Sequence, residues 1–122
     1  MAYVYDPTNI FARILRGEIP NKTVMETTHT LAFHDIHPQA PVHVLVIPKG
    51  PFVTFDHFAG EASAAQILDF HRTSAAVCVL LDIAPGLGYR TISNAGAQGM
   101  QEVPHYHLHI LGGKVMGQLI GG

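Results

Sequence analysis

Residues 104–111 read Pro104-His105-Tyr106-His107-Leu108-His109-Ile110-Leu111, and this stretch decides how the fold is interpreted. Histidine alternates here with aromatic or apolar residues, which predicts a β-strand because successive side chains on a strand point to opposite faces. Three imidazoles then share one face, with Cα atoms about 6–7 Å apart. The other face carries Tyr106, Leu108 and Ile110. The pattern predicts a strand with one core face and one chemically active face.

The sequence on either side predicts short strands and two helices. Apolar residues at helical spacing follow Asp6-Pro7, a cap and first-turn proline, and predict a short helix over residues 8–16. An alanine-rich stretch without internal glycine or proline predicts a long helix over residues 60–83. The predicted strands are Thr23–Glu26, Thr30–Phe33, His43–Ile47, Tyr89–Asn94 and Pro104–Leu111. We therefore expect an α+β fold in a single domain spanning residues 1–122.

Composition excludes several classes of protein. Charged residues make up only 13% of the chain and the net charge is −2, so there is no broad basic surface for a nucleic acid or an anionic membrane. Cys78 is the only cysteine, which excludes an internal disulfide. The first ten residues do not resemble a signal peptide, and the longest apolar run, residues 75–81, is too short to span a bilayer. We expect a soluble cytoplasmic protein with no membrane or nucleic-acid partner.

The histidine row allows three interpretations. A single histidine is usually a packed or half-buried side chain, but three on one face make that role less probable. A His-x-His pair on a strand can chelate zinc, yet three positions spread along a strand converge poorly on one ion, so we expect no metal ligands. Imidazole is also a neutral nucleophile near physiological pH and a competent leaving group. Covalent catalysis is therefore the preferred interpretation.

A glycine-rich segment before the histidines supports an anionic ligand. It runs from Asn94 to Gly99, and its glycines allow backbone N–H groups to approach a phosphate closely. Such turns are common, so the segment gains weight only in combination with the histidine row. Together the two motifs indicate chemistry at a phosphate.

Beyond these motifs, nearly the whole chain resembles the histidine triad family, and in particular its Hint-type nucleotide-binding branch. The matching stretches are Ile10-Phe11, residues 16–20 (Arg-Gly-Glu-Ile-Pro), residues 32–36 (Ala-Phe-His-Asp-Ile), residues 38–41, residues 43–49, residues 88–90, Asn94, residues 101–103 and residues 105–113. The Leu-Gly-Gly at residues 111–113 is similar to the Hint branch. The resemblance implies a five-stranded antiparallel sheet with one short N-terminal helix and one long central helix. It also implies a homodimer formed through the long helix and a strand.

The resemblance further implies hydrolysis of the P–N bond of purine nucleoside 5′-phosphoramidates through a nucleotidyl-histidine intermediate, with no cofactor. His107 would be the nucleophile, assisted by His105, His109 and His43. The phosphate would be bound around Asn94, Met100, Gln101 and Glu102, and the ribose by Asp35. The base pocket would consist of Ile10, Phe11, Ile14, Phe33, His34 and Ile36. Without the resemblance, Asp35 would be interpreted as a turn residue and the apolar members as core.

Two positions depart from the family pattern. Met100 occupies a place where the family often has glycine, so methionine is strained there if the backbone needs a positive φ. The tail after Gly113 has only nine residues and no tryptophan, which bears on the choice of leaving group. The alternatives are a dinucleoside polyphosphate hydrolase or nucleotidyl transferase, a non-catalytic nucleotide-binding module, and a metal-binding protein.

Overall fold

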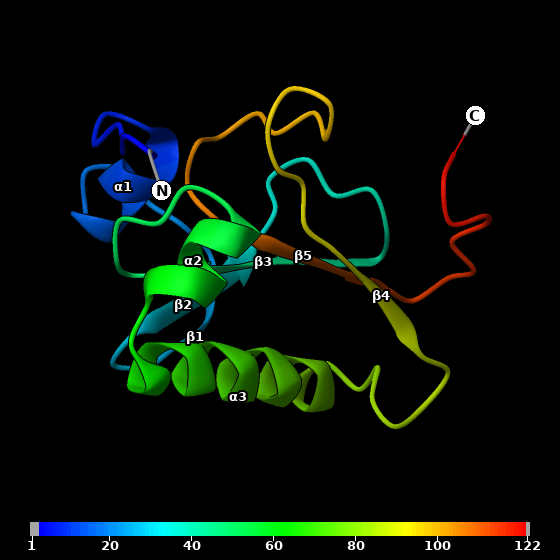
Figure 1. The fold of residues 1–122 in the computed structure, drawn as a ribbon. Helices are drawn as coiled ribbons and strands as arrows, with labels where there is room; N and C mark the ends of the chain where they lie inside the picture. The colour runs from blue at the N-terminus through cyan, green and yellow to red at the C-terminus, as the bar shows by residue number, and fades with distance from the viewer. Residues whose placement is uncertain (1–2, 122) are drawn as a thin grey trace.

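The computed structural model describes residues 3–121 and contains one five-stranded antiparallel sheet with the strand order β1-β2-β3-β5-β4 (Figure 1). The elements are α1 (Ile10–Leu15), β1 (Thr23–Glu26), β2 (Thr30–His34), β3 (Val42–Pro48), α2 (Phe55–Glu61), α3 (Ala64–Leu80), β4 (Tyr89–Ile92) and β5 (Leu108–Gly112). The α+β class and the five-stranded sheet predicted from the sequence are confirmed.

Side-chain alternation on the central strands creates two separate cores. Val44, Val46 and Ile110 point to the face covered by α3, which contributes Phe70 and Val77. On the opposite face, which α1 covers, the core cluster is Phe11, Ile14, Leu31, Phe33, Leu45 and Ile47. In Figure 1, α3 lies below the sheet and α1 above it. Leu45 belongs to this second cluster and pairs with His109 in the β3–β5 ladder, so the side chain of His109 lies on the α1 face.

Both predicted helices differ from the structure at their ends. The first helix is shorter than residues 8–16, and its cap is Asn9, whose side chain accepts a 2.9 Å hydrogen bond from the backbone N–H of Ala12. The predicted long helix is two helices, because Ser63 caps α3 in a reciprocal capping box with Gln66. This cap starts a new helix three residues after Gly60, while α2 begins earlier, at Phe55.

The last strand is also shorter than predicted and begins at Leu108 instead of Pro104. Pro104 has no N–H, and the N–H groups of His105 and Tyr106 donate to the carbonyls of Val103 and Phe52. This backbone therefore leaves the β3–β5 ladder, and the three histidines do not form one straight row. The neighbouring strand β4 also stops early, at Ile92 instead of the predicted Asn94.

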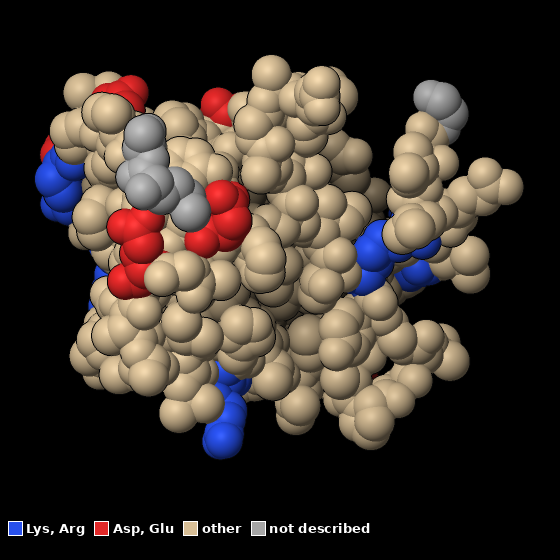
Figure 2. Space-filling view, in the orientation of Figure 1, with Lys and Arg blue, Asp and Glu red and all other residues tan. Residues whose placement is uncertain are grey.

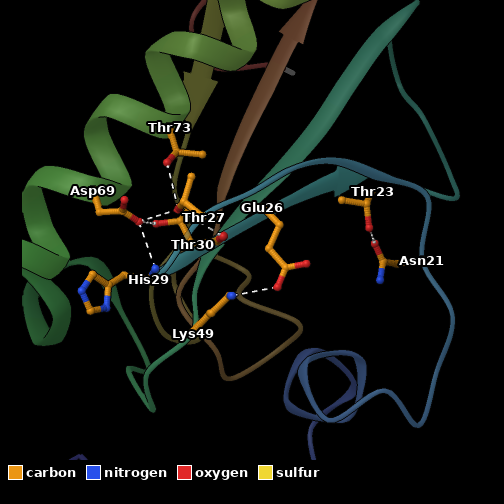
Figure 3. A network of polar contacts seen from close by, with 9 residues as sticks. All are labelled: Asn21, Thr23, Glu26, Thr27, His29, Thr30, Lys49, Asp69 and Thr73. Atoms are coloured by element: carbon orange, nitrogen blue, oxygen red, sulfur yellow. Dashed lines mark hydrogen bonds and ion pairs between the residues drawn. The ribbon is translucent and has the colours of Figure 1, made fainter.

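A polar network fixes α3 to the β1–β2 turn (Figure 3). One carboxylate oxygen of Asp69 accepts hydrogen bonds from the hydroxyls of Thr27 (2.6 Å) and Thr30 (2.7 Å) and from the backbone N–H of His29 (3.2 Å). Thr30 is fully buried, so its hydroxyl depends on this acceptor. The network sets the position of the helix along the sheet.

The sparse surface charge and the buried position of the single cysteine agree with the composition. On the face drawn in Figure 2, charged side chains form small separated groups. Cys78 belongs to α3, is 3% exposed and faces the core between α3 and the sheet. Among the described residues, no helix combines the length and apolar character needed to cross a membrane.

Candidate active site

His107 lies just before β5 and is held in one tautomer. Its Nδ1 is 2.7 Å from the backbone carbonyl oxygen of His105. Because a carbonyl oxygen only accepts, Nδ1 carries the proton and Nε2 keeps a free lone pair. The ring of Phe11 packs edge-on against His107, with centroids 5.0 Å apart and an interplanar angle of 85°. His107 is only 7% exposed, so its orientation is fixed by both contacts.

A second chain of hydrogen bonds determines the proton positions on His43 and His109. The backbone N–H of Gln39 donates to Nδ1 of His43 at 3.0 Å, so the proton of neutral His43 is on Nε2. The Nε2–H of His43 donates to Nδ1 of His109 at 2.9 Å. A carboxylate oxygen of Asp35 lies 3.4 Å from the same Nε2 atom of His43. Neutral His109 therefore carries its own proton on Nε2. The arrangement leaves this N–H as the donor at the end of the chain.

The third triad histidine, His105, has a different environment. It is fully buried, its Nε2 is 2.8 Å from the Pro48 carbonyl oxygen and its Nδ1 is 2.6 Å from the Tyr5 hydroxyl. Both ring nitrogens are thus used by protein atoms. His105 contributes its backbone carbonyl to His107 instead of its ring.

Burial favours the neutral form of all four imidazoles. It lowers the pKa of His105 and of His109 to about 4. Burial also lowers the pKa of His43, although the Asp35 carboxylate opposes it. The pKa of His107 is lowered by burial too, against its hydrogen bond to His105 and the charges of Asp35 and Glu102. At neutral pH the site therefore contains an uncharged His107 beside uncharged hydrogen-bond donors.

The predicted phosphate loop closes on itself. The side-chain amide of Gln101 donates to the carbonyls of Val53 (2.6 Å) and Val103 (3.1 Å), while its oxygen accepts from the N–H of Gly96 (3.0 Å). Gln101 is thus a clamp on the loop. Met100 has φ of 58°, which is the positive value that makes methionine strained at this position.

Glycine is required at one position of this loop. A Cβ on Gly99 would lie 2.5 Å from the carbonyl oxygen of Ala95, so only glycine permits this approach. Glu102 is exposed and forms no ion pair within residues 3–121, and its charge acts on His107. Asn94 is half-buried in the loop after β4.

The residues predicted for the nucleoside lie around the α1 face. Phe11, Ile14 and Phe33 are buried in the core cluster that forms the wall beside His107. Ile10 (43% exposed), Ile36 (76% exposed) and the exposed His34 lie at the surface. One oxygen of Asp35 accepts a 2.8 Å hydrogen bond from the backbone N–H of His37, which is a turn interaction, and the other faces His43.

One group of side chains could hold a metal ion. Asp35, His43 and His109 each offer a ligand atom, and these atoms lie within 4.8 Å of one another. An oxygen and two nitrogens suit zinc. An ion bound there would replace the hydrogen bond between the two histidines. The sequence did not reveal this group, because only the folded chain brings Asp35 next to His43 and His109.

Sequence reasoning missed two contributors to the site. Tyr5 lies 100 residues from His105 in sequence, and the Gln39 N–H is a backbone group with no sequence signature. The resemblance covered Gln39 without giving it a role, and nothing in the pattern around Tyr5 indicates a contact with the triad.

Comparison with known proteins places this geometry in a family. The HIT domain model matches residues 16–116. An uncharacterised 13.2 kDa HIT-like protein of Azospirillum brasilense is 52% identical over 120 residues, covering 98% of each chain. A 14 kDa zinc-binding protein of Zea mays is 41% identical over 117 residues, covering 91% of this chain and 86% of its own.

Solved structures agree with the sequence relatives. A HIT family hydrolase from Legionella pneumophila superposes with a TM-score of 0.80 at 36% identity, covering 89% of this chain and 96% of its own. A histidine triad nucleotide-binding protein from Candida albicans gives a TM-score of 0.76 at 30% identity, covering 84% and 73%. With a domain match over most of its length and relatives well above 30% identity, this chain belongs to the histidine triad (HIT) family.

Proposed function

We propose that this protein hydrolyses purine nucleoside 5′-phosphoramidates, with Nε2 of His107 as the covalent nucleophile. The observation that carries the proposal is the 2.7 Å contact between Nδ1 of His107 and the His105 carbonyl, which leaves the Nε2 lone pair free. Nucleophilic catalysis requires an unprotonated nitrogen, and burial lowers the pKa of His107 in the required direction. A hydrolase is also the coarse function named for the Legionella structure.

The reaction then has two balanced steps. The His107 lone pair attacks the α-phosphorus, the P–N bond of the substrate breaks, and the leaving nitrogen takes a proton from solvent and departs as an amine. Water then attacks the same phosphorus, the bond to His107 breaks, and the electron pair returns to Nε2. The water contributes its hydroxyl to the nucleoside monophosphate and its proton to solvent. The covalent intermediate thus avoids direct attack of water on the original anionic amidate.

His109 is suited to stabilising charge on the phosphate. Its Nδ1 accepts from His43, so its Nε2–H is free to donate a hydrogen bond to a phosphate oxygen. His109 is adjacent to the nucleophile, since the two ring centroids are 5.0 Å apart. His43 would hold the His109 ring in this orientation through the same hydrogen bond.

Three groups of residues would bind the base, the ribose and the phosphate of the nucleotide. The apolar wall of Phe11, Ile14 and Phe33 supports a planar base, with His34, Ile10 and Ile36 at its rim. Asp35 would accept hydrogen bonds from the ribose hydroxyls. Asn94 and the loop carrying Met100, Gln101 and Glu102 would face the phosphate, mainly through backbone N–H groups. The name of the Candida neighbour supports a nucleotide ligand.

The proposal includes a cytoplasmic homodimer. β4 is an edge strand, and a groove of about 410 Å³ lies between α3, β4 and β5. Beside it on α3, Val79 and Leu80 are 63% and 58% exposed. Unpaired strand edges and exposed apolar surface favour association, so a second copy is the expected occupant.

The test is turnover of an adenosine 5′-phosphoramidate with a fluorogenic amine, with and without EDTA. We expect wild-type protein to release the amine in both conditions. His107→Ala should lose turnover but still bind AMP, because the residues proposed for the base and ribose are intact. Full-rate turnover by the variant would exclude His107 as the nucleophile. AMP binding without turnover of the amidate would favour the non-catalytic module, or the polyphosphate hydrolase if a dinucleoside polyphosphate is cleaved.

A further inference from the structure

The segment before α1 is folded into a defined turn against the triad. Asp6 accepts hydrogen bonds from the N–H (2.9 Å) and the hydroxyl (2.6 Å) of Thr8, and its carbonyl accepts from the Asn9 side chain (2.7 Å). A guanidinium nitrogen of Arg16 donates to the Pro7 carbonyl at 2.8 Å. These contacts set the path that the chain follows into the N-terminal end of α1. They bring the ring of Tyr5 edge-on to His105, with centroids 5.6 Å apart.

The proton positions between Tyr5 and His105 follow from the acceptor on the far side of the imidazole. The Pro48 carbonyl, 2.8 Å from Nε2 of His105, can only accept, so Nε2 carries the proton. Nδ1 then has a lone pair, and the Tyr5 hydroxyl, 2.6 Å away, must be the donor. His105 is 0% exposed, so water does not offer a replacement. One phenol therefore determines whether a buried imidazole has all its hydrogen bonds.

This imidazole belongs to the residue that orients the nucleophile. The backbone carbonyl of His105 accepts from Nδ1 of His107 at 2.7 Å, while the His105 N–H donates to the Val103 carbonyl at 2.8 Å. Ring and backbone of His105 are thus held together by four partners. A ring that turns away from Tyr5 also leaves the Pro48 carbonyl, so the contacts that hold the residue fixing His107 are weakened together.

We propose that Tyr5 is a positioning residue, whose hydroxyl supplies the donor that Nδ1 of His105 requires and so holds the His105 ring, and with it the carbonyl directed at Nδ1 of His107. The kinetic consequence rests on the proposed function, whereas the hydrogen bond between Tyr5 and His105 does not. The hydroxyl itself carries the effect, because phenylalanine would preserve the ring contact with His105 and remove only the donor. Tyr5 thereby makes the segment before α1 part of the active site.

The first experiment reads this hydrogen bond directly. Histidine is labelled with ¹⁵N, and the imidazole shifts of His105 are compared in wild type and Tyr5→Phe. Both proteins should show the neutral Nε2–H tautomer that the Pro48 carbonyl requires, and Tyr5→Phe should move the Nδ1 signal downfield because its lone pair loses the donor. Tyr3→Phe is the matched control, since its hydroxyl donates to the exposed Asp56 at 2.7 Å in the same segment. It should leave the His105 signals unchanged.

The second experiment measures kcat and KM for the phosphoramidate. Tyr5→Phe should lower kcat about tenfold with KM nearly unchanged, because the nucleophile is misdirected while the nucleotide contacts remain. Tyr3→Phe should match wild type. A Tyr5→Phe protein with the wild-type Nδ1 shift and the wild-type kcat overturns the proposal. If wild type itself releases no amine, the proposed function fails, and the Nδ1 shift alone decides the role of Tyr5.

Discussion

Opposing influences on the pKa of His107 make its titration sensitive to single residues. Burial lowers this pKa, while the hydrogen bond to His105 and the carboxylates of Asp35 and Glu102 raise it. Glu102 is exposed and has no ion-pair partner within the described part of the chain, so it can be changed with little effect on packing. Changing Glu102 is therefore the best way to test what sets the pKa of His107.

Glu102→Gln should move the acidic limb of the pH profile of kcat/KM to lower pH. Removing the negative charge lowers the pKa of His107, so more of the nucleophile is unprotonated in acid. Amine release measured between pH 4.5 and 8 checks the direction. Glu61→Gln, an exposed carboxylate near the end of α2, is the control and should leave the limb in place. A limb that moves to higher pH would show that Glu102 acts on a different group.

Met100→Gly should stabilise the protein by about 0.5 kcal/mol, because a positive φ costs a side-chain-bearing residue roughly 1–2 kcal/mol and glycine returns part of this gain as unfolded-state entropy. The value of φ at Met100 is 58°. Urea denaturation checks the change. Ala97→Gly in the same loop has no such strain to relieve and should destabilise. If both variants lose stability, the strain at Met100 is offset by contacts of its side chain.

At the scale of elements, α3 is positioned by one carboxylate. Burial raises the pKa of Asp69, but its hydrogen bonds with Thr27, Thr30 and His29 outweigh this and leave the pKa below its usual value. The carboxylate is therefore charged when it accepts these bonds, and charge-assisted bonds are stronger than neutral ones. This contrasts with the Lys49–Glu26 pair in the same view (Figure 3), whose glutamate is exposed.

Asp69→Asn should lower the free energy of unfolding by about 1–3 kcal/mol, because a neutral amide oxygen replaces a charged acceptor of three bonds. Glu26→Gln should change it by less than about 1 kcal/mol, since exposed ion pairs contribute little. Urea unfolding monitored by circular dichroism measures both. Equal losses in the two variants would contradict the role given to Asp69.

The sequence predicted elements better than their ends. Alternation and helical spacing correctly indicated the five strands and the α+β class. The boundary between α2 and α3 was missed because Ser63 and Gln66 form a cap that apolar periodicity does not reveal. β5 was made too long because the histidine alternation continues past the point where Pro104 and the Phe52 carbonyl redirect the backbone.

The members of the candidate site came mainly from the family resemblance, since residue pattern alone indicated only the histidine row and the glycine-rich loop. The resemblance named Asp35, His43 and His109, yet their mutual contacts depend on the register of three strand segments. Tyr5 could not be found, since its partner lies 100 residues away and its placement depends on the turn at Asp6.

Across the whole molecule, the buried His105 and the half-buried His109 link stability to pH. His105 and His109 have pKa values of about 4 in the folded protein against an ordinary 6.5. Between these values the unfolded chain binds protons that the folded protein does not, so stability is full above about pH 6.5 and falls as the pH decreases toward 4. The loss is at most about 1.4 kcal/mol per pH unit for each histidine.

Urea unfolding at pH 7.5, 6, 5 and 4.5 checks this prediction. The free energy of unfolding should fall steadily below pH 6.5. His109→Gln should reduce the slope, whereas His71→Gln, at an exposed position on α3, should retain it. A stability that is constant down to pH 4.5 would mean that the imidazoles are protonated in the folded state.

If a second copy of the chain binds in the groove, a charge placed there should weaken dimerisation. Ala75 lines the groove between α3 and β4, so a glutamate there would place an unpaired charge in the interface. Ala75→Glu should weaken dimerisation about a hundredfold by light scattering or sedimentation. Ala65→Glu, exposed in the first turn of the same helix, should remain a dimer. A monomeric wild type at all concentrations would remove the dimer from the proposal.

The single thiol makes the covering of the groove chemically visible. Cys78 is 3% exposed on α3 and lines the groove between α3, β4 and β5, and burial raises its pKa, so we expect its alkylation to be slow. No other cysteine competes for the reagent. Because a second copy of the chain would cover this groove, alkylation should slow further as the dimer forms, and the mass of the intact protein records it without a dye or an engineered label.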